Sequence, residues 1–279
     1  MPLSETPRQS ADLSFKVIHP LHEHAQIALP FAHALKLALA SRGELEIVDL
    51  RSNHEGGAGV RALLEKWGVL PPNSPREDVE KIGLKVTKVI KNGNEKKDLT
   101  KRIEKHFHDV LVIGVDSHKD ILHLFGQDLV AYLATNIRTA ALYVPSAGRP
   151  FVDPFTGEAL LNTVLMPIAA SPPPDGAFKL LRRLLGIFPA VRPRIIGLHS
   201  GVEFPFVSGS LLEGLSWTEQ LASEGVVKAV VDAARAHRAD LIIMATKGRD
   251  TLAKKIMGSI TEQVLRASPC PVLSVPAEE

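Results

Sequence analysis

Short apolar runs alternate along the chain with longer segments in which apolar residues recur every three or four positions. The short runs predict strands within 15–24, 44–50, 84–92, 108–115 and 140–145, and again within 162–171, 192–200, 215–222, 239–245 and 272–276. Among the longer segments, those at 27–40, 95–107, 176–188 and 224–237 have the helical period. Strands that alternate with helices predict a parallel sheet covered by helices on both faces.

The order of these elements occurs twice. Each copy has an aspartate before its fourth strand (Asp109, Asp240) and a proline at the end of its fifth (Pro145, Pro276), 36 residues apart in both copies and at an offset of 131. Chance rarely gives this spacing together with the same order of elements. The sequence therefore indicates a duplication.

Domain boundaries follow from the duplication. A length of 279 residues suits two domains that each bury a core. We expect a first domain at 13–146, a linker at 147–160 that is rich in proline and glycine, and a second domain at 161–279. The first copy is longer by about 16 residues, which we place within 51–82, after its second strand.

Composition excludes several classes of protein. Apolar residues make up 45% and charged residues 23%, as in folded soluble domains, and the formal net charge of +2 does not favour a nucleic-acid partner. The N-terminus lacks the order of a signal peptide, and the apolar stretch at 26–40 is interrupted before it reaches membrane-spanning length. A single cysteine, Cys270, excludes an internal disulfide, and we expect it to be a small buried residue. These features predict a cytoplasmic protein without a membrane partner.

One loop could carry chemistry. The stretch "ATKGRDTLAKKIMGSI" at 245–260 follows an apolar strand and leads into a helix. Ser259 and Glu262 have the spacing of a capping box, which would start the helix there. A helix start beside glycines and lysines can bind phosphate, although a plain turn between strand and helix has the same signature. Both interpretations stay open on these residues.

The loop also resembles a known family. Ala245, Gly248, Gly258 and Ser259 are similar to the motif GxxGx(9)G(S/T) of the universal stress proteins, and the ending "VLRASPCPVLSVP" is similar to theirs. Because the resemblance covers both copies, it implies a tandem universal stress protein. Each domain would have a five-stranded parallel sheet of order 3-2-1-4-5, and the domains would pair through their last strands as an intramolecular pseudo-dimer.

The resemblance further implies a regulatory stress-response binding module with ATP and Mg²⁺ in the second domain. The site would comprise Ala245, Lys247, Gly248, Lys254, Gly258 and Ser259. Backbone N–H groups would hold the phosphates, and Lys247 and Lys254 would assist. Nothing in the sequence requires an enzyme.

Departures from the family motif leave alternatives open. Ala245 replaces the first glycine, and Ala169 and His22 stand where the family has an aspartate at the end of the first strand. The matching loop of the first copy has Ser117 and Gln127 in place of motif residues and several aspartates that would repel phosphate, so we expect no nucleotide there. A protein of the same fold that acts as an interaction scaffold is therefore a second hypothesis.

Histidines supply a third hypothesis. An enzyme could use His19, His22 and His24, which follow the first strand, and a metal ion could join them. His106 and His108 precede the fourth strand at the opposite edge, where we expect a surface role. The sequence does not reveal protein partners, and it leaves open a homodimer beyond the intrachain pairing.

Overall fold

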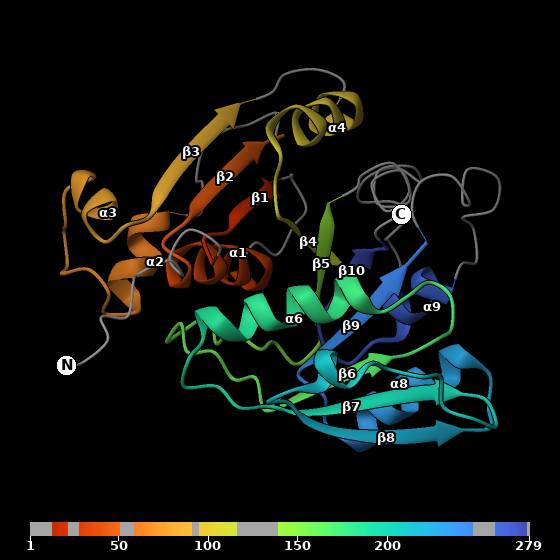
Figure 1. Cartoon of the computed structure of the whole chain (residues 1–279). Coiled ribbons are helices and arrows are strands. Elements are labelled where there is room, and N and C mark those ends of the chain that lie inside the picture. The colour runs from red at the N-terminus through yellow and green to blue at the C-terminus, as the bar shows by residue number, and fades with distance from the viewer. Residues whose placement is uncertain are drawn as a thin grey trace, which may run out of the picture.

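Ten strands of the described chain form one sheet, in the order β3-β2-β1-β4-β5-β10-β9-β6-β7-β8 (Figure 1). The computed structural model describes residues 13–21, 28–50, 59–90, 95–115, 139–247 and 260–277. The strands of the first half are β1 Lys16–Leu21, β2 Glu44–Asp49, β3 Lys85–Ile90, β4 Val110–Val115 and β5 Ala140–Pro145. Those of the second half are β6 Thr163–Pro167, β7 Arg194–Ser200, β8 Ser216–Ala222, β9 Leu241–Thr246 and β10 Val272–Pro276.

Strand pairing confirms the predicted order. Within each half all neighbours are parallel and follow 3-2-1-4-5. The two halves meet where β5 and β10 pair antiparallel, with Leu142 opposite Leu273. These leucines are equivalent in the two copies, so the pairing is close to two-fold symmetric and forms the expected pseudo-dimer within one chain.

Helices cover both faces of the sheet. They are α1 Ala28–Ala40, α2 Val60–Lys66, α3 Glu77–Lys81, α4 Glu95–His106, α6 Asp175–Ile187, α7 Gly209–Leu212, α8 Val226–Ala236 and α9 Ile260–Ala267. Buried side chains of α1 and α6 belong to one apolar core, and those of α4, α8 and α9 to the other. The two cores lie on opposite faces because alternate residues of a strand point to opposite faces, and each runs across both halves because the sheet is continuous. No helix in the described part of the chain combines the length and the apolar character needed to cross a membrane.

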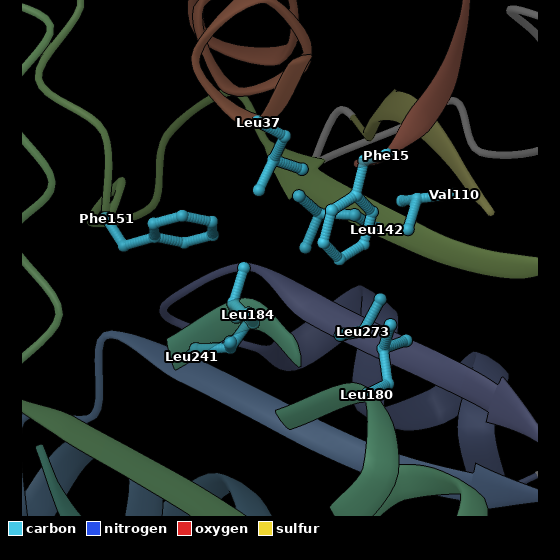
Figure 2. A pocket seen from close by; sticks show the side chains of 9 residues that line it. All are labelled: Phe15, Leu37, Val110, Leu142, Phe151, Leu180, Leu184, Leu241 and Leu273. Carbon is cyan, nitrogen blue, oxygen red and sulfur yellow. The ribbon is translucent and has the colours of Figure 1, made fainter. Parts of the chain in front are cut away.

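Apolar side chains from both halves meet under the seam between β5 and β10. Figure 2 shows them pointing toward one another from α1, α6 and the adjoining strands. They include the equivalent pairs Leu37 with Leu184, Val110 with Leu241, and Leu142 with Leu273. The void between them is only about 10 Å³ and is lined by apolar residues, so it is a packing defect and not a ligand site.

The duplicated aspartates hold the start of each half's first strand. Asp109 Oδ2 accepts a hydrogen bond from the main-chain N–H of Lys16 (2.7 Å), and Asp240 Oδ2 accepts one from that of Thr163 (3.0 Å). Each aspartate also faces an arginine from outside its own half-sheet. Arg183 of α6 lies 2.5 Å from Asp109, and Arg149 lies 3.7 Å from Asp240.

The segment predicted as a linker packs as part of the core. Phe151 and Val152 are almost fully buried, and Val152 forms an isolated β-bridge with Ala159. His33 of α1 contacts this segment through a hydrogen bond and a ring contact. Its Nε2 accepts the main-chain N–H of Val152 (3.3 Å), and its ring meets that of Phe151 edge to face with centroids 4.5 Å apart. The segment thus joins α1 to the seam between the halves.

The extra residues of the first copy pack against this same segment. Trp67, just after α2, donates its indole N–H to the carbonyl of Pro154 (3.3 Å). Its ring covers Gly157, where a Cβ would lie only 2.4 Å from the indole. Lys66 places its ammonium 4.1 Å from the centre of the Phe155 ring. Residues 59–82 therefore hold the segment in place from outside.

Cys270 lies before β10 with no exposed surface. Burial raises the pKa of its thiol to about 12, although a contact with Ser268 partly opposes this. Because the thiolate is the reactive form, we predict that a disulfide reagent such as DTNB modifies Cys270 on the order of 100-fold more slowly in the native protein than in denaturant. Stopped-flow absorbance time courses at pH 8 measure both rates, and equal rates in the native and the denatured protein would contradict the prediction.

Candidate functional site

The carboxyl ends of β6 and β9 form the candidate site of the second half. These strands are neighbours in the sheet, with Val164 opposite Leu241. Their crossovers leave in opposite directions, because β6 leads toward β7 and β9 toward β10. Ligands of open α/β sheets bind at such a switch point, outside the carboxyl ends of the strands.

Ala245 lies in β9, where the resembled motif has its first glycine. Its partly buried side chain packs against the core under α6. It is not among the described non-glycine residues with positive φ, and it pairs with Val275 as a regular strand residue. Since the backbone here requires no left-handed conformation, alanine replaces glycine without strain.

Lys247 is exposed and follows the last residue of β9. The pairing of β9 with β10 ends at Thr246, whose carbonyl oxygen accepts a hydrogen bond from the N–H of Ala277 (2.8 Å). Lys247 therefore leaves the sheet at the edge where a ligand would bind. The other four predicted site residues, Gly248, Lys254, Gly258 and Ser259, lie outside the described residues.

Helix α9 begins at Ile260, the residue after the predicted N-cap. Since α9 connects two parallel strands, its N-terminus lies at the carboxyl edge of β9 and it returns along the sheet. Val264 and Leu265 are buried in the core, and Arg266 donates to Glu262 one turn earlier (2.6 Å). The positive end of the α9 dipole is thus directed to the candidate site.

Ala169 occupies the place at the end of β6 where the resembled family has an aspartate. Ala169 is exposed at that place, two residues beyond the strand. Asp175, the acidic residue nearest in sequence, opens α6. The next residue, Gly176, lies beside the end of β10, with an ideal Cβ 3.6 Å from the carbonyl oxygen of Pro276. The start of α6 is therefore on the far side of β9 from β6.

An aromatic group beside this edge was missed by the sequence analysis. His199 at the end of β7 donates from Nδ1 to the carbonyl of Ile168 (2.8 Å), which fixes its ring beside β6. The ring of Phe204 lies 6.1 Å from that of His199 and 6.3 Å from that of Trp217. Trp217 covers Gly197, where a Cβ would lie 2.2 Å from the indole. The half-buried rings of His199 and Phe204 lie beside this edge, and Trp217 extends the group toward Gly197 in the middle of β7. The tryptophan of β8 was the signal in the sequence for this group.

The histidines of the first half have different surroundings from those expected. His19 is buried within β1, where its Nδ1 donates to the carbonyl of Val112 (2.8 Å), while His22 and His24 lie outside the described residues. No group of three or more potential metal ligands occurs in the part of the chain that the structure describes. His106 is exposed as expected, but the side chain of His108 is only 4% exposed, so its predicted surface role is wrong.

Comparisons with known proteins find similarity to one family in the second half of the chain. Residues 211–276 match the sequence model of the universal stress protein family. A universal stress protein of Methanocaldococcus jannaschii is 42% identical over 59 residues, which are 21% of this chain and 34% of that protein. The chain thus matches about a third of the length of that relative.

Two solved structures share the fold over nearly the whole chain. A universal stress protein of Archaeoglobus fulgidus has a TM-score of 0.65 at 14% identity and covers 96% of this chain and 98% of its own. A Pseudomonas aeruginosa protein of the same description has a TM-score of 0.61 at 12% identity and covers 95% of each chain. The chain is therefore similar to universal stress proteins in sequence over part of its second half, and it shares their fold over nearly its whole length.

Proposed function

We propose that the second domain, which we place at 161–279, binds ATP with Mg²⁺ at the carboxyl ends of β6 and β9. The site comprises Ala245, Lys247, Gly248, Lys254, Gly258 and Ser259, and the protein acts as a cytoplasmic regulatory module in a stress response. In this proposal the backbone N–H groups at the start of α9 hold the phosphates, and Lys247 and Lys254 supply positive charge.

The observation that carries the proposal is the placement of α9. The helix starts immediately after Gly258 and Ser259, at the edge where Lys247 leaves β9. A free helix N-terminus favours an anion, and a glycine before it lets phosphate approach the backbone. The regular strand conformation of Ala245 supports the proposal further, because the departure from the glycine motif costs no strain there.

Calorimetric titration of the nucleotide-free protein with ATP and Mg²⁺ tests the site. We expect one saturable ATP per chain and no detectable binding by Gly258→Trp, because an indole would occupy the position of the phosphates. Gly209→Trp is the matched control, since nothing lies within 4 Å of a Cβ at Gly209. Unchanged affinity in Gly258→Trp, with folding intact by circular dichroism, would rule out this loop.

Lys247→Ala is a milder test of the same site. Lys247 is exposed and forms no ion pair with another described residue, so its removal should leave folding unchanged. Loss of a charge-assisted contact to phosphate, worth about 1.5–3 kcal/mol, predicts a roughly 10- to 100-fold weaker ATP affinity. Equal affinities of wild type and variant by calorimetry would remove Lys247 from the site.

A scaffold without nucleotide is the second candidate function. The segment after β7 exposes Val202 (99%) and Phe206 (91%), side chains that a partner surface could cover. The exposed Ala169, in place of an acidic residue, also agrees with this candidate. Absence of ATP binding at millimolar concentration, together with self-association in ultracentrifugation that Phe206→Ser abolishes, would favour the scaffold.

A further inference from the structure

The amino edge of the first half contains a second pocket, at the opposite edge of the sheet from the carboxyl ends. The starts of β1, β2 and β3 and the end of α4 enclose a volume of about 260 Å³. Its polar lining includes Lys16, Glu44, Glu46, Lys85, Thr87 and His108. This volume is below that of drug-sized sites and suits a small polar ligand.

Cations already engage both carboxylates of this amino-edge pocket. Glu46 contacts Arg102 through Nε, and His108 Nε2 lies 3.5 Å from its other oxygen. Burial alone would raise the pKa of Glu46, but the hydrogen bonds from His108 and Arg102 lower it to about 2, so it stays ionised. Glu44 lies 2.9 Å from the ammonium of Lys85. The carboxylates are therefore charged but neutralised by their partners.

Polar groups without a protein partner remain after these pairs are made. The Lys16 ammonium has no carboxylate within ion-pair distance among the described residues. His108 is 96% buried at its side chain, and its Nδ1 has no partner in the described part of the chain. A buried polar atom without a partner is costly, and a ligand or water commonly accounts for one. Two lysines and two carboxylates line the pocket, and Arg102 adds a positive charge beside Glu46 from outside the lining.

The second half shows that the fold does not need these polar residues. Strand register makes Ile196 the equivalent of Glu46, since each faces the third residue of its half's first strand, Leu165 of β6 or Ile18 of β1. The duplication likewise makes Ala239 the equivalent of His108, and both Ile196 and Ala239 are buried. In the turns before β4 and β9, the equivalent residues Phe107 (φ 41°) and Arg238 (φ 52°) both have a left-handed backbone conformation. The same backbone thus forms with an apolar cluster at this edge.

We propose that the amino-edge pocket binds a small oxyanion with the size and charge of inorganic phosphate. The ammonium of Lys16 and the hydroxyl of Thr87 supply the donors, and Nδ1 of His108 accepts a hydrogen bond from a protonated oxygen of the anion while Nε2 faces Glu46. Glu46 acts as a positioning residue, because it orients the ring of His108 through Nε2. This site is independent of the proposed nucleotide site, which lies at the other edge of the other half.

Titration with inorganic phosphate tests the pocket, with calorimetry and histidine-ring NMR as readouts. The Gly258→Trp protein serves as the parent, so that the proposed nucleotide site contributes nothing. We expect saturable binding that shifts the ring signals of His108, and at least a 10-fold weaker affinity in Lys16→Ala. Lys101→Ala is the matched control, an exposed lysine of α4 outside the pocket, and it should bind like the parent.

The double variant Glu46→Ile/His108→Ala carries the residues that the second half has at the same places. We expect it to fold with a somewhat lower Tm than the parent, because Arg102 loses its carboxylate partner, and circular dichroism checks that the fold is kept. We also expect no phosphate binding. The proposal is overturned if the parent does not bind phosphate at 10 mM, or if Lys16→Ala and the double variant bind it as tightly as the parent. Failure of ATP binding in the wild type would leave these results unaffected.

Discussion

Truncating Phe151 to alanine is expected to lower the free energy of unfolding by about 3–5 kcal/mol, the range for large-to-small changes at buried aromatic residues. The ring is 1% exposed, meets His33 edge to face, and lines the seam where the two halves join. Its loss removes apolar burial and an aromatic contact, and it enlarges a void that is now about 10 Å³. Urea unfolding monitored by circular dichroism measures the change.

Phe155→Ala is the matched control for this prediction. Phe155 belongs to the same segment but is 67% exposed, so its truncation should change the free energy of unfolding by only about 0.5 kcal/mol. A similar loss of unfolding free energy in both variants would mean that burial of the Phe151 ring is not what stabilises the segment. A negligible loss in Phe151→Ala would mean that the segment does not stabilise the seam.

Acidification from about pH 6.5 to pH 4 is expected to remove up to about 3 kcal/mol of stability through His33 alone. The ring has no exposed surface, and burial lowers its pKa to about 4 from an ordinary value of 6.5, although the hydrogen bond to Leu29 partly opposes this. Between these two values the unfolded chain binds a proton that the folded chain does not. Stability therefore falls as the pH falls through this window and is retained above it.

The structure also specifies which contact protonation would break. His33 Nδ1 donates to the carbonyl of Leu29 (2.7 Å), so Nε2 is the acceptor for Val152 and the ring is neutral. His33→Gln keeps a donor and an acceptor but cannot titrate. The difference in unfolding free energy between wild type and His33→Gln should shrink by about 3 kcal/mol from pH 7 to pH 4. A difference that is constant with pH would contradict the prediction.

Sequence reasoning reached the parallel α/β architecture because local signals determine it: apolar runs of strand length alternate with helical periods. The strand order 3-2-1-4-5 and the pairing of the halves through β5 and β10 came only with the family resemblance. The packing of 147–160 was not predicted, because proline and glycine mark the absence of regular structure and carry no signal for the burial of Phe151.

The candidate sites differ in how far the sequence could locate them. The edge that carries Lys247 was predicted because a glycine-rich loop between a strand and a helix is a contiguous pattern. The burial of His108 was not, because its partner Glu46 lies 62 positions away and only the pairing of β1 with both β2 and β4 brings them together. Topology correctly put His106 and His108 at the amino edge, but it contains no information on burial there.

The covalent connection of the two halves has a consequence for how their contact surfaces can change. In a dimer of identical chains every substitution enters both sides of a two-fold interface at once, so a contact that suits one side must suit its mirror position. Here each position is encoded once. Asp109 meets an arginine from the helix of the other half, whereas Asp240 meets one from the segment between the halves. A single gene for both halves therefore permits one-sided contacts, which identical subunits could acquire only in pairs.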